Sequence, residues 1–300
     1  MKFEKGNNKN VALVLSGGGA RGMAHIGVID EIIKSGYQIT SIAGTSIGSL
    51  IAGVYVSGKM DEFKDWVTQV TKFDVFKFMD FAISKGGFIK GEKIFNELKK
   101  FILDKNIEDL ILPYAAVAVD IKNHKEIVFR SGPLRKAIRA SVSIPTVLKP
   151  VFHNGLELVD GGVLNPLPID CIKRNDGDLL IVVDLGADIS YPVPKSKKVT
   201  VEQETNYRKT MEFINEKWSV YFKNDKQKRT GFFDLITESL YAMQMKLTQN
   251  TIKEHNPNMV VKISRKSCDL FEYHRSEELI QYGRKQFKKS LKEYKSNTQL

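Results

Sequence analysis

The chain has 300 residues, of which 42% are hydrophobic and 27% are charged, and this composition is that of an ordinary globular protein. Its two cysteines, Cys171 and Cys268, are far apart in the sequence and exclude a disulfide framework or a cysteine metal site. The net charge of +11 is concentrated in residues 195–300, which contain 22 Lys and Arg against 13 Asp and Glu. We interpret this region as a solvated surface or as a face for anionic lipid. Nucleic-acid binding is not expected, because no aromatic or helix-turn-helix signature accompanies the charge.

No targeting or membrane-spanning segment is expected. The N-terminus, MKFEKGNNKN, has no apolar run behind its lysines and is not a signal peptide. Residues 35–58 contain no charged side chain, but their apolar blocks are short, and a spanning helix needs roughly 20 mostly apolar positions. We therefore expect a cytoplasmic protein that contacts a membrane only at its surface.

The first 185 residues alternate strand and helix patterns. Apolar strands are predicted at 11–15, 39–43, 115–121, 126–132, 156–159 and 179–185. Helices are predicted through His25 to Ser35 and over 49–58, 61–73 and 133–141, whereas 73–88 is aromatic and irregular. Near-continuous apolar strands alternating with helices indicate a mostly parallel sheet covered on both faces, an α/β fold with three layers, α/β/α.

The pattern changes after this α/β part. Long helices are predicted at about 200–228, 232–254 and 276–294, with one strand at 259–263. We predict an α/β domain over 9–185 and a mainly helical, basic region over 198–300 that packs on it or is appended to it. The linker is placed at Lys195–Lys198, after a pair of prolines.

The first motif is the run Gly17–Gly22, which follows a strand and opens a helix. Its letters fit G-x-G-x-x-G, but a dinucleotide site also needs an acidic residue at the end of the second strand. Residues 43–46 occupy that place and are Ala-Gly-Thr-Ser, so the dinucleotide interpretation is rejected. An anion site remains, because glycines let successive backbone N–H groups point at an oxyanion at a helix N-terminus.

Ser46 lies in Gly-Thr-Ser-Ile-Gly, the G-x-S-x-G of a nucleophile elbow. A β-branched strand precedes it and an apolar helix follows, which is the context that an exposed nucleophile on a strained turn requires. Gly44 and Gly48 leave no side chain where such a turn would clash. The five letters alone are equally typical of a Gly-Ser turn, but the anion loop upstream favours a catalytic serine.

A histidine base for Ser46 is not evident. In an α/β-hydrolase the histidine follows the serine and the acid, and only His255 and His274 lie late enough in the chain. Both are in charged, surface-like sequence, which is typical of solvated histidines.

Three carboxylates are better placed than these histidines. Asp120, Asp160 and Asp184 each close an apolar strand, at the edge where α/β sheets have their chemistry. Position does not distinguish the three. Asp160 is favoured because Gly161 and Gly162 follow it and allow a sharp turn and a close approach to another loop.

SGGGARG, GTSIGSL and DGG, in this order, resemble the motifs of the patatin-like phospholipases. RASVSIPTVLKPV, residues 139–151, is similar to the segment that this family carries before its DGG. The resemblance covers about residues 9–185 and is closest to the small bacterial cytoplasmic members related to neuropathy target esterase. It implies a patatin-like fold and a serine acyl-ester hydrolase with a Ser-Asp dyad, no histidine, and neither a metal nor an organic cofactor.

The resemblance also implies residue roles, with Ser46 as nucleophile and Asp160 as general base and acid. It places Gly17, Gly18, Gly19 and Arg21 at the oxyanion hole, and the other motif glycines are Gly22, Gly44, Gly48, Gly161 and Gly162. For Asp160 to accept a hydroxyl proton, burial has to raise its pKa above the usual value of about 3.9. Arg21 either offsets the charge of Asp160 or packs at the helix start.

The implied substrate is a fatty acyl ester such as a lysophospholipid or a phospholipid. The aromatic stretch is either a cover for the acyl chain or ordinary core, and its members are Phe73, Phe76, Phe78, Phe81 and Phe88. The alternative function is that of a regulatory protein that binds lipid or a partner and turns over little.

Overall fold

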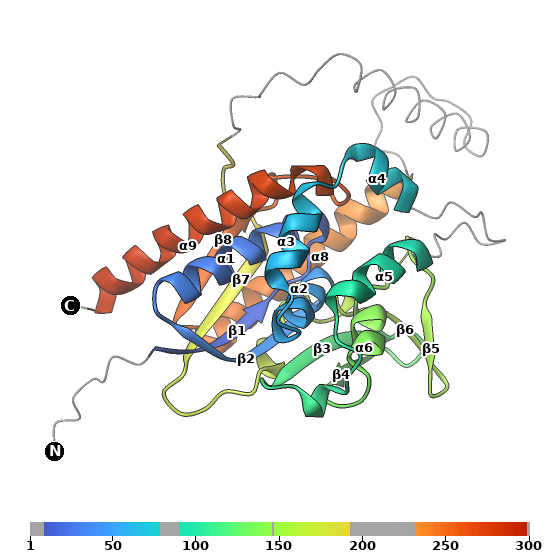
Figure 1. Cartoon of the computed structure of the whole chain (residues 1–300), viewed down its shortest axis with the longest axis horizontal. Helices are drawn as coiled ribbons and strands as arrows, with labels where there is room; N and C mark the ends of the chain where they lie inside the picture. The colour runs from blue at the N-terminus through green and yellow to red at the C-terminus, as the bar shows by residue number, and fades with distance from the viewer. Residues whose placement is uncertain (1–8, 79–90, 146, 193–231, 299–300) are drawn as a thin grey trace, which may run out of the picture.

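The computed structural model describes residues 9–78, 91–145, 147–192 and 232–298 (Figure 1). The predicted linker at Lys195–Lys198 and the predicted helix over 200–228 lie outside these ranges. In the described residues no helix combines the length and the apolar character needed to cross a bilayer.

One sheet runs through the described part of the molecule, with eight strands in the order β5-β6-β3-β2-β1-β7-β8 and with β4 paired to β3. Strands β1, β2, β3, β7 and β8 pair in parallel, while β4, β5 and β6 pair through antiparallel ladders. The strands are β1 (Asn10–Leu15), β2 (Gln38–Thr45), β3 (Tyr114–Asp120), β4 (Lys125–Phe129), β5 (Val151–His153), β6 (Leu156–Asp160), β7 (Leu179–Ala187) and β8 (Met259–Ser264).

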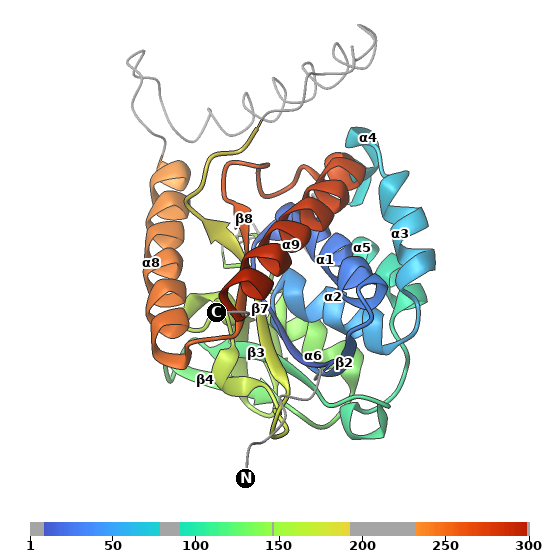
Figure 2. The ribbon, with the colours of Figure 1, turned by 90° about the vertical axis from the view of Figure 1, so that its left-hand side faces the viewer.

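Helices cover both faces of this sheet, as Figure 2 shows, and the predicted three-layer α/β fold is confirmed. On one side lie α1, α2 and α9, and on the other lies α8. The helices are α1 (Met23–Lys34), α2 (Ile47–Val56), α3 (Met60–Thr68), α4 (Lys72–Phe78), α5 (Glu92–Leu98), α6 (Leu134–Ser141), α8 (Phe232–His255) and α9 (Ser276–Thr298).

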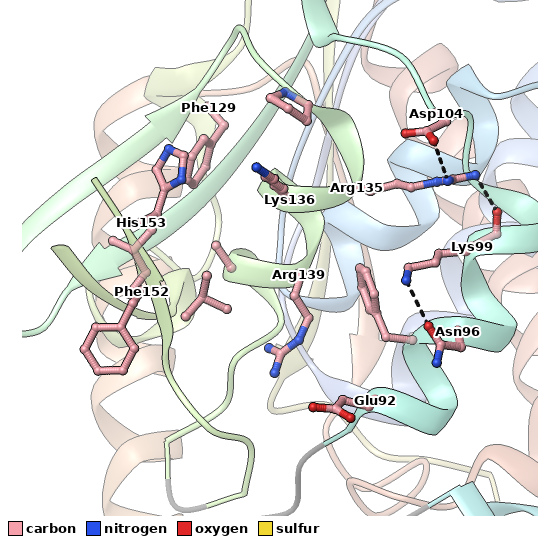
Figure 3. A pocket seen from close by; sticks show the side chains of 15 residues that line it. Glu92, Asn96, Lys99, Asp104, Phe129, Arg135, Lys136, Arg139, Phe152 and His153 are labelled. Carbon is pink, nitrogen blue, oxygen red and sulfur yellow. Dashed lines mark hydrogen bonds and ion pairs between the residues drawn. The ribbon is translucent and has the colours of Figure 1, made fainter. Parts of the chain in front are cut away.

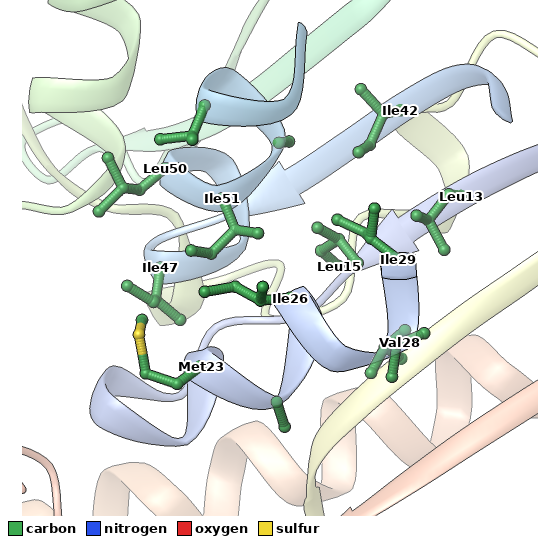
Figure 4. Close-up of a cluster of buried hydrophobic side chains, with 14 of the residues drawn as sticks. Leu13, Leu15, Met23, Ile26, Val28, Ile29, Ile42, Ile47, Leu50 and Ile51 are labelled. Atoms are coloured by element: carbon green, nitrogen blue, oxygen red, sulfur yellow. The ribbon is translucent and has the colours of Figure 1, made fainter. Parts of the chain in front are cut away.

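Strand β1 shows why an unbroken apolar run belongs in the middle of the sheet. Its successive side chains point to opposite faces. Leu13 and Leu15 join the large core under α1 and α2 (Figure 4), whereas Ala12 and Val14 join a smaller cluster that includes Ile252 of α8. Both faces of the strand are therefore buried, and for this reason its sequence shows no alternation of polar and apolar residues.

The described C-terminal residues, 232–298, are part of the same fold. Strand β8 extends the sheet by pairing in parallel with β7, and α9 lies along α1. The two helices touch backbone to backbone, since a Cβ added to Gly27 would lie 1.9 Å from the Ile280 carbonyl oxygen. A Cβ on Gly283 would likewise lie 2.1 Å from the carbonyl oxygen of Ala24.

The elements that the sequence did not predict are short. Strand β5 has three residues, and α5 lies in a stretch for which no element was predicted. The aromatic stretch begins as a helix, α4, rather than as an irregular segment. A pattern of period 2 or 3.6 needs more residues than these elements supply.

One edge of β3 carries two strands, end to end. Strand β2 pairs with residues 114–117 of β3 and β6 pairs with residues 118–120, while β4 pairs with 116–120. Because β4 overlaps both, it occupies the opposite edge, and β2 and β6 share the remaining one. Thr45 faces Val117 and Asp160 faces Ala118, so the carboxyl ends of β2 and β6 meet.

Candidate active site

Ser46 occupies a strained turn between β2 and α2. Its backbone has φ 55° and ψ −127°, a conformation that a residue with a side chain rarely adopts and that is concentrated at functional sites. The turn is tight enough that a Cβ on Gly44 would lie 2.4 Å from the Gly48 backbone. A Cβ on Gly48 would lie 2.2 Å from the Leu15 carbonyl oxygen. The two flanking glycines of the motif are thus required by close approach.

Hydrogen bonds hold the backbone of this turn. The Ser46 N–H donates to the Ser141 hydroxyl at the end of α6 over 2.9 Å, and its carbonyl accepts from the Ser49 hydroxyl at 2.7 Å. The Leu50 N–H donates to the same carbonyl at 3.2 Å. Both peptide groups of Ser46 are thus engaged in hydrogen bonds.

Asp160 is the last residue of β6, is 5% exposed, and lies against Ser46. Its N–H donates to the Ser143 carbonyl at 2.9 Å, and its Oδ1 accepts from the Gly162 N–H at 2.7 Å. Oδ2 is buried and completes no hydrogen bond of normal geometry with a described group. The Ser46 hydroxyl is close enough to this carboxyl group to act on its pKa.

Burial raises the pKa of Asp160 to about 6. The Ser46 hydroxyl and the Gly162 N–H both act to lower that pKa, but they offset only part of the effect of desolvation. The carboxylate is still ionised at neutral pH, and it is a much stronger base than an exposed aspartate.

The glycine loop packs directly against Ser46, since a Cβ on Gly17 would lie 3.4 Å from the Ser46 Cβ. The expectation for Gly17 needs correction, because its N–H already donates to the Pro166 carbonyl at 3.0 Å. The N–H groups of Gly18 and Gly19 donate to no acceptor in the described part of the chain. Both amides are therefore left with an unused hydrogen-bond donor.

Arg21 is buried and its guanidinium turns toward the C-terminal region. Its Nη1 donates to the carbonyl oxygens of Arg265 and Cys268, and the group lies 5.1 Å from the ring centroid of Tyr241 in α8. That Arg21 offsets the charge of Asp160 or packs at the helix start stays a prediction. Desolvation raises the pKa of the buried Asp184, and the charge of Arg21 offsets a small part of this effect.

Three further motif glycines, Gly22, Gly161 and Gly162, stand at close contacts around these loops. A Cβ on Gly22 would lie 2.2 Å from the Ile47 side chain, and one on Gly161 would lie 2.3 Å from the Val117 carbonyl oxygen. Gly162 accepts a hydrogen bond through its carbonyl from Gln244 of α8, at 3.0 Å.

The competing carboxylates have other partners. Asp120 accepts from the side chain of Asn123 and the N–H of Lys122, and the hydrogen bond from Asn123 lowers its pKa. Asp184 accepts from the Gly186 N–H at 2.8 Å. Neither forms a hydrogen bond with Ser46 in the described residues, so of the three carboxylates only Asp160 lies against the serine.

No hydrogen bond joins a histidine to Ser46 in the described residues. His255 is exposed at the end of α8, and burial lowers the pKa of His274, which lies beside Lys72. His25 is fully buried beneath the glycine loop, where its Nε2 bonds to the Ser16 carbonyl at 3.0 Å. Burial lowers the pKa of His25 to about 4, so it is neutral at physiological pH.

These observations can be set beside known proteins. The profile of a family described as patatin-like phospholipase matches residues 13–171, more than half of the chain. The chain belongs to the patatin-like phospholipase family. This membership supports a lipid hydrolase, and the predicted resemblance is confirmed.

Relatives of this patatin-like protein fall into two groups by length. An uncharacterized NTE family protein of Mycobacterium tuberculosis is 29% identical over 330 aligned residues, which cover 95% of the chain and 92% of that protein. Human patatin-like phospholipase domain-containing protein 6 is 33% identical over 184 residues, 59% of the chain and 13% of that protein. Lysophospholipase NTE1 of Yarrowia lipolytica is 32% identical over 185 residues, 59% of the chain and 13% of that protein. The chain therefore corresponds to a small part of the two longer relatives.

Other features of the patatin-like protein lie apart from Ser46. A groove of about 690 Å³ runs between α5, α6 and β5 (Figure 3), and neither Ser46 nor Asp160 lines it. Arg135 crosses this groove to Asp104 at 3.0 Å.

The predicted aromatic cover is only partly described: Phe73 is 72% exposed, and the ring of Phe78 lies 6.0 Å from that of Trp66. Phe81 and Phe88 lie outside the described residues, and for Phe76 only the backbone, in α4, is described.

Sequence reasoning missed the residues that support the site from a distance. The Ala20 N–H donates to the Leu270 carbonyl at 2.9 Å, and a Cβ on Gly19 would lie 2.4 Å from the Leu270 side chain. With Gln244 and Tyr241, this makes the C-terminal region one wall of the site. No local signal marks these residues, whereas Ser141 does lie in the recognisable segment before DGG.

The raised pKa of Asp160 predicts a gain in stability when its charge is removed. A group whose pKa is about 6 when folded and about 3.8 when unfolded adds stability below pH 3.8 and loses that contribution as the pH rises through 6. Asp160→Asn should therefore raise the free energy of unfolding at pH 8 by up to about 3 kcal/mol. Urea denaturation between pH 4 and 8 measures this, and the gain should shrink as the pH falls.

Asp120→Asn is the matched control for this stability measurement. The pKa of Asp120 is lowered, so losing its charge should decrease stability at pH 8. An Asp160→Asn variant that is less stable than wild type at pH 8 would contradict the raised pKa.

Proposed function

We propose that this protein is a serine acyl-ester hydrolase in which Ser46 is the nucleophile and Asp160 the general base. The observation that carries the proposal is the meeting of a strained serine with a buried carboxyl group and two unused amides. These are the three components that acyl transfer requires: a nucleophile, a base and an oxyanion site. The helical, basic region after residue 198 is proposed to complete the catalytic domain over 9–185.

In this mechanism the Ser46 Oγ attacks the ester carbonyl carbon while Asp160 takes its proton. The carbonyl oxygen becomes an oxyanion and accepts hydrogen bonds from the N–H groups of Gly18 and Gly19, one such donor being worth roughly 3 kcal/mol to the barrier. As the tetrahedral intermediate collapses, the protonated Asp160 gives the proton to the leaving alcohol. Water then attacks the acyl-enzyme, with Asp160 again as base, and releases the acid and the free serine.

The pKa of about 6 suits Asp160 to both halves of this cycle. A base is most effective when its pKa is near the working pH, since it is then ionised yet still binds a proton. We expect kcat/KM to rise with pH through about 6 and then level off.

The proposed substrate is a fatty acyl ester such as a lysophospholipid or phospholipid. Support comes from the family and from the relative described as a lysophospholipase. The proposed location is the cytoplasm, with peripheral contact with anionic membrane through the basic C-terminal region. No metal or organic cofactor enters the proposed steps.

Two substitutions test the dyad directly. Ser46→Ala removes the nucleophile and should abolish hydrolysis of a soluble acyl ester, with a melting temperature within a few degrees of wild type. Asp160→Asn keeps the shape but cannot take the proton, so kcat should fall by roughly 10²–10⁴.

Four controls accompany these variants in the same assay. Asp120→Asn, Asp184→Asn, His255→Ala and His274→Ala should keep most of the turnover, once folding has been checked. A folded histidine variant that falls as far as Ser46→Ala would point to a triad. Failure of a fluorophosphonate probe to label the wild-type protein would favour the regulatory, lipid-binding alternative.

Membrane contact is tested by co-sedimentation with vesicles. Each Lys or Arg near an anionic surface contributes roughly 1 kcal/mol, and residues 195–300 have 22 of them against 13 acidic residues. Binding to phosphatidylcholine–phosphatidylserine vesicles should be strong at low salt and weak at high salt. Equal binding to pure phosphatidylcholine vesicles would contradict the proposed contact with anionic lipid and favour the interpretation of the basic region as a solvated surface.

A further inference from the structure

The dipeptide Asn165–Pro166, just beyond the DGG turn, is bonded to all three loops of the candidate site. The Asn165 N–H donates to the Gly161 carbonyl at 2.8 Å, and its own carbonyl accepts from the Thr45 hydroxyl at 2.8 Å. The next carbonyl, that of Pro166, accepts from the Gly17 N–H at 3.0 Å. One short segment thus connects the turn after Asp160, the residue before Ser46 and the first glycine of the anion loop.

The side chain of Asn165 anchors this segment to the rest of the fold. Its Nδ2 donates to Glu126 Oε2 on β4 at 3.0 Å and to Asp170 Oδ1 at 2.9 Å. Carboxylates only accept hydrogen bonds, so the amide has to present its NH₂ group to them. Hydrogen bonds with ionised acceptors are about twice as strong as neutral ones.

We infer that Asn165 is a positioning residue, whose amide, held between the Glu126 and Asp170 carboxylates, sets the placement of Ser46 relative to Asp160 and the Gly18–Gly19 amides. The inference rests on the proposed hydrolase. Asn165 touches no reacting atom and acts only through the three backbone bonds of its segment. A general base works within about 2.6–3.2 Å of its proton, and a misplacement of about 1 Å costs on the order of 10²-fold in rate.

Glu126 and Asp170 also form a cluster with Cys171, in which the three potential metal-ligand atoms lie within 4.8 Å of one another. The amide of Asn165 already stands where their electronegative atoms converge, and its Nδ2 also lies 3.9 Å from the Cys171 sulfur. Burial raises the pKa of Cys171 to about 12, with a contribution from Asp170, which favours the protonated thiol. The cluster is therefore explained by the hydrogen bonds that its members accept from the Asn165 amide, with no need for a cation.

The test inverts the polarity of this anchor. Asn165→Asp places a third carboxylate beside those of Glu126 and Asp170, so the two hydrogen bonds are replaced by repulsion. The kcat on a soluble ester should fall at least tenfold while KM changes less than threefold. Glu126 and Asp170 are exposed, and the pair Glu126→Gln/Asp170→Asn should keep wild-type kcat because amide oxygens still accept from Asn165. Combining all three changes lets the two new amides donate to the new carboxylate, and kcat should recover to at least half of wild type.

Asn175→Asp is the matched control, since Asn175 also donates to a carboxylate, that of Asp178, at the opposite end of the sheet. It should leave kcat unchanged. If Asn165→Asp does not fold, Glu126→Ala/Asp170→Ala removes both acceptors and should lower kcat at least threefold.

Two results would overturn the inference: a folded Asn165→Asp with wild-type kcat, or a folded triple variant that stays as slow as the single one. Failure of the proposed function has a different signature, because the wild-type enzyme itself would then neither hydrolyse the ester nor react at Ser46.

Discussion

The whole site depends on two strands sharing one edge of β3. Strand β2 ends opposite Val117 and β6 ends opposite Ala118, so their carboxyl ends face each other across a single residue step. The peptide after each end has to turn away at once, which places Ser46 on one turn and Asp160 at the other. A slip of one residue in either register would move the serine and the carboxyl group apart and turn their side chains to the wrong face.

The same arrangement explains why the carboxyl group is buried. The edge of β3 is filled on both sides of the Ser46–Asp160 contact, and α8 covers the turn through Gln244. The resulting desolvation raises the pKa of Asp160 and makes its ionised form costly to the folded state. At neutral pH the folded protein is therefore less stable than it would be with a neutral side chain at this position.

The sequence predicted the parts of this site that depend on local chemistry. Apolar runs located β1 and β7, and the glycines around Ser46 and after Asp160 marked turns that only glycine permits. Resemblance to the family assigned the same two residues. The short β5 was missed because three residues carry no period.

Features fixed by distant contacts could not be predicted. The Gly17 N–H is taken by Pro166, and nothing within the glycine motif indicates which of its amides stay unused. Leu270 and Gln244 reach the site from the C-terminal region only because β8 pairs with β7 and α8 lies on the sheet. The anchoring of Asn165 needs Glu126, a residue of a neighbouring strand. Contacts of this kind belong to the tertiary fold, and no window of sequence contains them.

The central claim is that burial beside β3 makes Asp160 the group that activates Ser46. The most direct measurement is the rate and site of fluorophosphonate modification, read by mass spectrometry of the digested protein at pH 7.5. In the wild-type protein the adduct should appear on the peptide that contains Ser46, and in folded Asp160→Asn its rate of formation should be at least about 10²-fold lower. Modification of another serine, or an unchanged rate at Ser46 in Asp160→Asn, would contradict the claim.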